Sequence, residues 1–222
     1  MLEIKGLFKK YQEATRDILI FQDLNINFAP ETKNIFLGSS GSGKSTFLNL
    51  ISGLDSPNAG EILFANEDIC QYNDQLKTLY RRKHIGFIFQ FFNLLPTLSV
   101  RENILLALEL NEINNRENQD YVFSLLDKVG LLDRLDSMPE TLSGGQQQRV
   151  AIVRALAHKP KLIIADEPTG NLDTETAQTI ISLIENLVQE TKATLMIATH
   201  DEKLLNIADN VFKIENKGLT KL

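Results

Sequence analysis

The segment from Gly38 to Ser45 constrains the fold of this chain more than any other part of the sequence. It reads Gly-Ser-Ser-Gly-Ser-Gly-Lys-Ser. The apolar run of residues 34–37 before it is typical of a buried parallel strand. Residues 45–52 after it predict a helix, and Gly53 is placed to end that helix. Strand, glycine loop and helix in this order predict a nest of backbone N–H groups at a helix N-terminus, which suits a polyphosphate anion.

The residue types in this loop predict its ligand. Gly38, Gly41 and Gly43 let the backbone take positive φ angles and approach a ligand closely, because they carry no Cβ. Lys44 would contact the β- and γ-phosphates of a nucleotide, and the Ser45 hydroxyl would bind Mg²⁺. The alternative for the bare pattern is a flexible Gly/Ser turn, and the flanking strand and helix weigh against it.

A second apolar run, residues 162–165 after Lys161, is followed by paired carboxylates. It would form a buried strand that delivers Asp166 and Glu167 to its carboxyl end, where open α/β sheets bind their ligands. Two solvated acids after a strand are common, so the pair alone is weak evidence. Following a phosphate loop, it indicates the metal-binding and hydrolytic side of a nucleotide site.

The sequence Leu-Ser-Gly-Gly-Gln at residues 142–146 lies upstream of these carboxylates. It precedes a helical pattern over residues 146–156. Ser143 and the backbone N–H groups of Gly144 and Gly145 therefore form a second predicted anion site at a helix N-terminus.

With these motifs, the chain resembles the ATP-binding cassette (ABC) ATPases over essentially its whole length. The resemblance implies an α/β P-loop NTPase fold, with a RecA-like core, an antiparallel β subdomain and an inserted helical subdomain. In a single ABC ATPase domain, residues 1–90 and 150–222 would form the nucleotide-binding core. Residues 91–149 would form the helical subdomain that carries the signature motif.

Alternating apolar residues predict strands near the N-terminus. Leu2 and Ile4 alternate with polar residues, and so do Leu24, Ile26 and Phe28. We expect these segments to join the phosphate-loop strand in one core sheet, which mixes an antiparallel edge with a parallel centre.

Helix signals dominate the middle of the chain. Residues 99–102 form a capping-box sequence that opens a helix through Leu108. Further helices are expected over residues 120–129 and 177–188, the latter before a buried strand at 193–199. This alternation of strands and helices around the carboxylates predicts an α/β architecture.

The resemblance assigns roles to residues around the expected site. Asp166 would hold Mg²⁺ through its water shell, and Glu167 would be the general base that orients the attacking water. Gln90 resembles the glutamine that contacts Mg²⁺ and this water in the family. His200 resembles the histidine that contacts the γ-phosphate, and residues 170–173 resemble a loop that crosses the dimer interface. Singly, these could be a loop amide, a strand-end histidine and a polar turn. The expected catalytic residues are Lys44, Gln90, Glu167 and His200; the expected metal-binding residues are Ser45, Gln90 and Asp166; the expected nucleotide contacts are Tyr11, Gly38, Ser39, Ser40, Gly41, Ser42, Gly43, Lys44, Ser45, Thr46, Ser143, Gly144, Gly145 and Gln146.

Tyr11 fits the position of the aromatic residue that stacks on adenine in this family. The alternative is an ordinary surface tyrosine.

The second anion site implies a homodimer in the ATP state. One ATP does not need two helix N-termini of the same chain at its γ-phosphate. In the family that the chain resembles, Ser143 and its neighbours would face the ATP of the partner subunit, so that two copies enclose two nucleotides with two-fold symmetry. ATP binding would close this assembly, and hydrolysis would open it.

Composition narrows the class of protein. Among 222 residues, 43% are hydrophobic, yet no apolar run approaches the roughly 20 residues that span a bilayer. A net charge of −6 argues against a general nucleic-acid surface. Cys70 is the only cysteine, so an intrachain disulfide is impossible, which is consistent with a reducing cytoplasm. With no signal-peptide pattern at residues 1–5, we expect a cytoplasmic protein, held at the inner face of the membrane through a permease.

Residues 38–41, 93–103 and 167–173 look like those of the lipoprotein-releasing ATPase LolD and the macrolide-export ATPase MacB, and the cell-division ATPase FtsE is similar. This group drives a membrane protein with few spanning helices and a large extracytoplasmic domain. MacB contains both parts, but this chain ends at Leu222, so we expect a separate permease. The alternatives are an FtsE-like regulatory ATPase and a soluble ABC ATPase without a transport role.

Aromatic residues after the expected strand at 85–90 suggest where a permease binds. Residues 91–94, which read Phe-Phe-Asn-Leu, are expected to form an exposed docking surface. Phe87 and Phe89 are expected to lie in the core instead.

Overall fold

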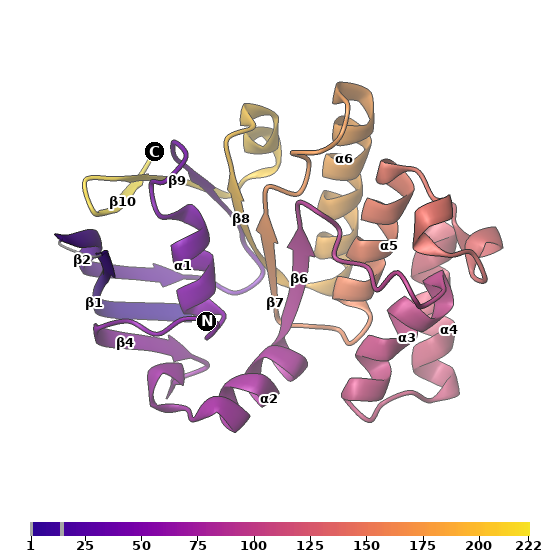
Figure 1. Ribbon diagram of the computed structural model, residues 1–222, viewed down its shortest axis with the longest axis horizontal. Helices are drawn as coiled ribbons and strands as arrows, with labels where there is room; N and C mark the ends of the chain where they lie inside the picture. Colours follow the sequence, from indigo (N-terminus) through magenta and orange to yellow (C-terminus); the bar gives the residue numbers. More distant parts are fainter. Residues whose placement is uncertain (1, 14–15) are drawn as a thin grey trace. The chain divides into compact units, whose positions relative to one another are not determined.

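The computed structural model describes residues 2–13 and 16–222. By the density of its contacts, the described chain divides into two compact units. The first runs to Arg81 and resumes at Thr194, and the second is Arg82–Ala193. Figure 1 follows the chain through both units.

The N-terminal strands of the first unit form an antiparallel sheet of their own, with the order β2-β1-β4-β5. Ile4 pairs with Ile26 of β2 on one side and with Ile62 of β4 on the other. Our expectation that these strands join the phosphate-loop strand in one sheet is therefore wrong. Their alternating pattern buries one face, as antiparallel sheets do, whereas the phosphate-loop strand buries three consecutive residues, Asn34 to Phe36, and has parallel neighbours. The strands are β1 Leu2–Glu13, β2 Arg16–Phe28, β4 Ala59–Phe64 and β5 Glu67–Asp68.

A second sheet in this unit carries the phosphate loop. Its strands follow the order β10-β9-β3-β8, in which β3 is parallel to both β8 and β9, and β9 and β10 form a hairpin. Ile35 and Phe36 of β3 are fully buried, which confirms the buried strand expected before the glycine loop. The strands are β3 Lys33–Leu37, β8 Thr194–Thr199, β9 Asn210–Glu215 and β10 Gly218–Lys221.

Helix α1, Lys44–Ile51, follows β3 as expected, and Gly53 after it has a φ of +67°. Phe47 of α1 packs edge-on or tilted against Phe28 and Phe36, and these two rings also contact Phe212. This aromatic cluster buries large rings from β2, β3, α1 and β9, so it holds the base of the phosphate loop rigidly. The other helical segments of this part are η1 Ile69–Gln71, η4 Glu202–Ile207 and α2 Asp74–His84, which continues into the second unit.

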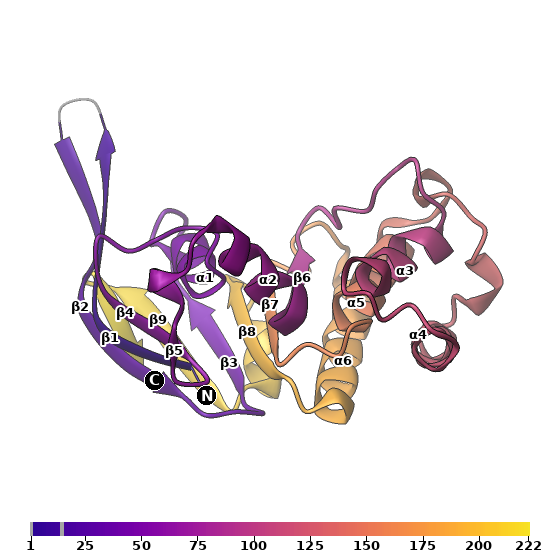
Figure 2. The ribbon, with the colours of Figure 1, turned by 90° about the horizontal axis from the view of Figure 1, so that it is seen from below.

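The second unit combines a parallel strand pair with helices, which Figure 2 shows from below. Strand β6 pairs with β7 in parallel, and α5 packs against β6 and also contacts α3, α4 and α6. Ser99 forms the expected capping box at the start of α3, whereas α4 begins four residues before the expected position, because Asn115 caps it. The elements are β6 Ile85–Phe89, β7 Leu162–Asp166, α3 Val100–Leu110, α4 Arg116–Lys128, α5 Gly144–Leu156, α6 Thr174–Thr191, η2 Leu132–Arg134 and η3 Pro139–Thr141.

The aromatic residues of β6 are less buried than expected. Phe87 and Phe89 are half-buried and stack on each other with ring centroids 5.4 Å apart, since residues two apart share one face of a strand. Phe91 is 72% exposed, as expected for the segment that follows. Within the residues that the structure describes, no helix combines the length and the apolar character needed to cross a bilayer.

Candidate functional site

The phosphate loop closes on its own lysine. The Lys44 ammonium donates hydrogen bonds to the carbonyl oxygens of Gly38 and Ser39 at 2.7 and 3.3 Å. Lys44 is 91% buried and begins α1, while Gly43 precedes the helix with a φ of +105°. The side chain therefore bends back over the loop, so that its positive charge lies beside the N-terminal end of the helix.

Two glycines of the loop have no room for a side chain. A Cβ on Gly43 would lie 2.7 Å from Ile20 Cγ2, and the positive φ there already disfavours other residues. A Cβ on Gly38 would lie 2.3 Å from Ser42 Oγ. Gly41 and Gly43 take the positive φ that the sequence predicts, whereas Gly38 does not, so the prediction is wrong for the backbone of Gly38. There the absence of a Cβ matters because Ser42 packs against this residue.

The donors gathered here fit the phosphates of a nucleotide and Mg²⁺. The loop offers backbone N–H groups at the first turn of α1, an ammonium group, and the hydroxyls of Ser45 and Thr46. Helix N-termini and lysine favour phosphate oxygens, and a serine hydroxyl at this position is a ligand that Mg²⁺ accepts. No carboxylate belongs to residues 38–46 to oppose an anion.

Within the same unit, Tyr11 lies against α1. Its hydroxyl donates a 2.6 Å hydrogen bond to Asp55 and also interacts with the Thr46 side chain. Burial and then the Asp55 contact raise the pKa of Tyr11 above its ordinary value, so the ring is neutral at physiological pH. Tyr11 remains 37% exposed. The structure thus brings the predicted stacking residue to the first turn of the phosphate-loop helix.

His200 follows β8, and Thr199 at the end of that strand pairs with Leu37, the last residue of β3. Because the two strands are parallel, His200 and Gly38 leave the sheet at the same edge. The fold therefore brings the predicted γ-phosphate sensor to the phosphate loop.

In the second unit, Gln90 and Glu167 leave neighbouring strands at the same edge. Phe89 of β6 pairs with Asp166 of β7, and each is the last residue of its parallel strand. Glu167 takes the left-handed backbone conformation, with a φ of +48°. A non-glycine residue in this region is strained, and such strain concentrates at functional sites.

A contact that the sequence did not predict links Gln90 to the loop after the carboxylates. Asn171 donates to the Gln90 carbonyl oxygen at 3.0 Å, and the Gln90 amide donates to Asn171 Oδ1 at 3.3 Å. A Cβ on Gly170 would lie 2.9 Å from Gln90 Nε2. Gln90 and residues 170–171 are therefore closely coupled, although 81 residues separate Gln90 from Asn171.

The signature segment forms the N-terminus of α5, as predicted. Ser143 and Gln146 exchange the two hydrogen bonds of a capping box, at 2.9 and 3.3 Å. A Cβ on Gly145 would lie 2.6 Å from Thr176 Cγ2, so glycine lets α5 approach α6 closely. Fully buried Gln148 donates a 2.6 Å hydrogen bond to the Pro168 carbonyl oxygen, and no sequence signal had marked it. It ties α5 to the residue after Glu167.

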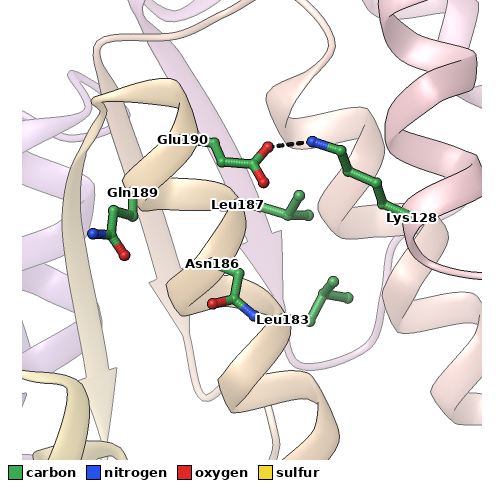
Figure 3. Close-up of a pocket in the computed structure, with 6 residues that line it drawn as sticks. All are labelled: Lys128, Leu183, Asn186, Leu187, Gln189 and Glu190. Carbon is green, nitrogen blue, oxygen red and sulfur yellow. Dashed lines mark hydrogen bonds and ion pairs between the residues drawn. The ribbon is translucent and has the colours of Figure 1, made fainter.

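An open hollow of about 610 Å³ also lies in the second unit, along α6 (Figure 3). It is lined by Lys128, Leu183, Asn186, Leu187, Gln189 and Glu190. Lys128 and Glu190 form an ion pair across it, and both side chains are about half exposed. Exposed pairs of this kind contribute little to stability. None of the predicted site residues lines this hollow.

Comparison with known proteins decides the family. The family model described as "ABC transporter" matches residues 21–170. The chain belongs to the ABC transporter family. It is accordingly an ATPase of membrane transport, and it works with ATP and Mg²⁺. This confirms the resemblance and the α/β P-loop fold inferred from the motifs.

Several relatives match nearly the whole chain. An uncharacterized ABC transporter ATP-binding protein of Mycobacterium tuberculosis is 42% identical over 99% of this chain and 88% of its own length. The lipoprotein-releasing system ATP-binding protein LolD of Saccharophagus degradans is 37% identical over 100% of this chain and 97% of its own length. The macrolide export ATP-binding/permease protein MacB of Rhodopirellula baltica is 40% identical over 97% of this chain, which spans 32% of that protein.

Among solved structures, the ATP-binding cassette MJ0796 in a dimeric post-hydrolysis state, bound to ADP and Pi, superimposes with a TM-score of 0.85. It is 33% identical and covers 100% of this chain and 98% of its own. At this sequence identity, the similarity supports the ATPase chemistry of the family as well as the fold.

Proposed function

We propose that this chain is the ATPase subunit of a LolD- or MacB-type machine, in which ATP binding and hydrolysis drive a separate permease in export or lipoprotein release. The observation that carries the proposal is the N-terminus of α5 at residues 143–145, which we infer to be a second anion site in a chain that already has a phosphate loop. The full-length similarity to LolD supports the choice of machine.

We assign the chemistry of one turnover to six side chains. Lys44 would bind the β- and γ-phosphates, and the Ser45 hydroxyl and Asp166 would hold Mg²⁺, whose charge would stabilise the phosphates when it is bound. Glu167 accepts a proton from the attacking water, while Gln90 orients this water. His200 contacts the γ-phosphate. Support comes from the phosphate-loop geometry, the strand-end positions of Gln90, Glu167 and His200, and the shared family.

The homodimer is the working form in this proposal. The N–H groups of Gly144 and Gly145 begin α5 and have no earlier helical turn to accept them. Two copies related by a two-fold axis would each present this end to the partner's nucleotide. The dimeric state of MJ0796 supports this arrangement.

The permease is proposed to dock on residues 91–94. Phe91 exposes 72% of its surface, so it offers a partner apolar area that binding would remove from water. In the second unit, this segment follows Gln90 directly, so a partner bound there would sense the glutamine that orients the attacking water. The chain would then lie in the cytoplasm, held at the membrane by the permease. Residues 91–149, which contain α3 and α4, are proposed as the helical subdomain of this single ATPase domain, with 1–90 and 150–222 as the nucleotide-binding core.

Affinity capture with Glu167→Gln tests the proposal. Because this variant keeps ATP binding but lacks the general base, we expect it to accumulate with ATP and Mg²⁺ as a dimer. From detergent-solubilised host membranes, it should retain a permease with few spanning helices and a large extracytoplasmic domain, identified by mass spectrometry. Phe91→Ala in the same background should lose the permease and keep the dimer.

The captured partner separates the alternatives. A division-associated membrane protein linked to wall hydrolases would replace the export role with an FtsE-like regulatory one. Recovery of only ribosomal or other soluble proteins would overturn the transport role and leave the ATPase assignment intact.

A further inference from the structure

A part-buried ion pair between Lys9 and Asp55 contacts Tyr11. The Lys9 ammonium donates to Asp55 Oδ1 at 2.7 Å and to the Ser56 carbonyl oxygen at 2.8 Å. The other carboxylate oxygen of Asp55 accepts the Tyr11 hydroxyl at 2.6 Å. Lys9 Nζ also lies 4.5 Å from the centroid of the Tyr11 ring. Lys9 and Tyr11 are two residues apart on β1, so their side chains share one face of the strand.

This cluster is built into the fold and is not an ordinary surface ion pair. Only 7% of the Lys9 side chain is exposed, and a buried ammonium is costly unless it is paired. Burial acts to raise the pKa of Asp55, but the hydrogen bonds from Lys9 and Tyr11 outweigh it and hold that pKa below its ordinary value. Asp55 is therefore ionised under physiological conditions and keeps both partners.

The cluster also fixes the tyrosine relative to the phosphate loop. Asp55 lies in the turn that leaves α1, where its backbone N–H bonds to the Asn49 carbonyl oxygen. Thr46, in the first turn of the same helix, interacts with the Tyr11 hydroxyl. The ring is thus tied to both ends of the helix that begins at Lys44, and Lys9 covers part of it.

We propose that Asp55 and Lys9 are positioning residues, which hold the Tyr11 ring as a platform for the adenine base while the phosphates bind at Lys44. This proposal rests on the nucleotide binding proposed above. Stacking between an aromatic side chain and a base depends on the orientation of the ring, and an ordered ring loses less conformational entropy when the base binds.

The test compares ligands with and without a base. In Asp55→Ala, the hydroxyl of Tyr11 loses its acceptor and Lys9 loses its counter-ion. We expect the Kd for Mg²⁺–ADP, measured by calorimetry, to rise about three- to ten-fold, the range for the loss of one hydrogen bond. The Kd for inorganic pyrophosphate, measured by competition, should stay unchanged, because the phosphate loop is intact. Lys9→Met should shift the two values in the same way.

Matched variants separate positioning from a loss of folding. Asp17→Ala removes a carboxylate from the same hairpin, where Asp17 pairs with Lys10 at 2.6 Å, and should leave both Kd values unchanged. Tyr11→Phe keeps the ring and removes the hydroxyl, so adding Asp55→Ala to it should weaken ADP binding less than Asp55→Ala does in the wild type.

Two results would overturn the proposal. One is an unchanged ADP affinity in Asp55→Ala. The other is an equal loss for ADP and pyrophosphate, which would show that the cluster supports only the fold of the loop. If the unmodified chain bound neither ligand, the nucleotide site itself would be wrong, and this outcome is distinct from both.

Discussion

At the scale of single residues, His158 shows how burial sets the protonation state of a side chain. Its Nε2 lies 3.1 Å from the Ile85 carbonyl oxygen, which can only accept, so the neutral ring carries its proton on Nε2. Burial, opposed by this hydrogen bond and assisted by nearby His84, lowers the pKa of His158. Among the residues that the structure describes, no cluster of potential metal ligands involves it.

We expect the stability of the protein to fall in mildly acidic solution because of His158. An unfolded histidine titrates near pH 6.5, and the folded pKa is lower, so between these values the unfolded chain binds more protons. The contribution is complete above pH 6.5 and is lost as the pH falls from there toward the folded pKa. Urea unfolding between pH 7.5 and about pH 5 should show a smaller loss of unfolding free energy in His158→Gln than in the wild type.

A side chain that does not titrate provides the control for this prediction. Gln189→Ala alters an exposed side chain without an ionisable group, so it should retain the wild-type dependence on pH. An identical loss of stability in wild type and His158→Gln would show that His158 does not control this transition.

At the scale of elements, two helices begin with the same kind of capping box, but we propose different roles for their N-termini. Ser99 opens α3 and Ser143 opens α5, each with a reciprocal capping box. Both caps satisfy backbone donors at a helix start. Only the N-terminus of α5 is proposed to face a nucleotide. Comparing the two helices therefore separates the contribution of a cap to stability from a contribution to ATP hydrolysis.

Ser99→Ala and Ser143→Ala should each lower the unfolding free energy by about 1 kcal/mol, because each removes one capping interaction. Only Ser143→Ala should lower the ATPase rate at saturating ATP. Chemical denaturation and phosphate-release assays on both variants would measure the two effects. An equal loss of ATPase activity in both would mean that the role of Ser143 is to cap the helix and that it does not act on nucleotide.

At the scale of the whole molecule, a two-fold arrangement means that residues of both chains bind each nucleotide. In the proposed dimer, the phosphate loop of one copy works with the signature segment of its partner. A substitution of Lys44 in one copy and of Ser143 in the other therefore impairs the same nucleotide site and leaves the second site intact.

Mixing two defective chains should restore ATP trapping. In a Glu167→Gln background, Lys44→Ala cannot bind ATP, and Ser143→Arg places a bulky cation at the contact with the partner. Neither chain alone should retain ATP through gel filtration. An equal mixture should retain about a quarter of the ATP that the background chain retains, since half of the dimers are mixed and each of these has one intact site.

A chain carrying both changes is the control for the mixing experiment. Combined with either single variant, it leaves no intact site and should retain no ATP. If the mixture of single variants retained no more ATP than each variant alone, the composite arrangement would be excluded.

The sequence by itself determined the local parts of this protein. The buried strand before the phosphate loop, the helix after it, the cap at Ser99 and the helix that follows Ser143 all depend on neighbouring residues, and all are present in the structure. The glycines of the loop could be predicted for the same reason. The family followed from these motifs.

Only the tertiary structure decided which distant segments meet. It separated the N-terminal strands into a sheet of their own and added the β9–β10 hairpin, which no sequence pattern had indicated. It joined Tyr11 to Asp55 across 44 residues and Gln90 to Asn171 across 81. An ordinary aspartate or asparagine in a loop carries no periodic signal, because its partner is chosen by how sheets and helices pack.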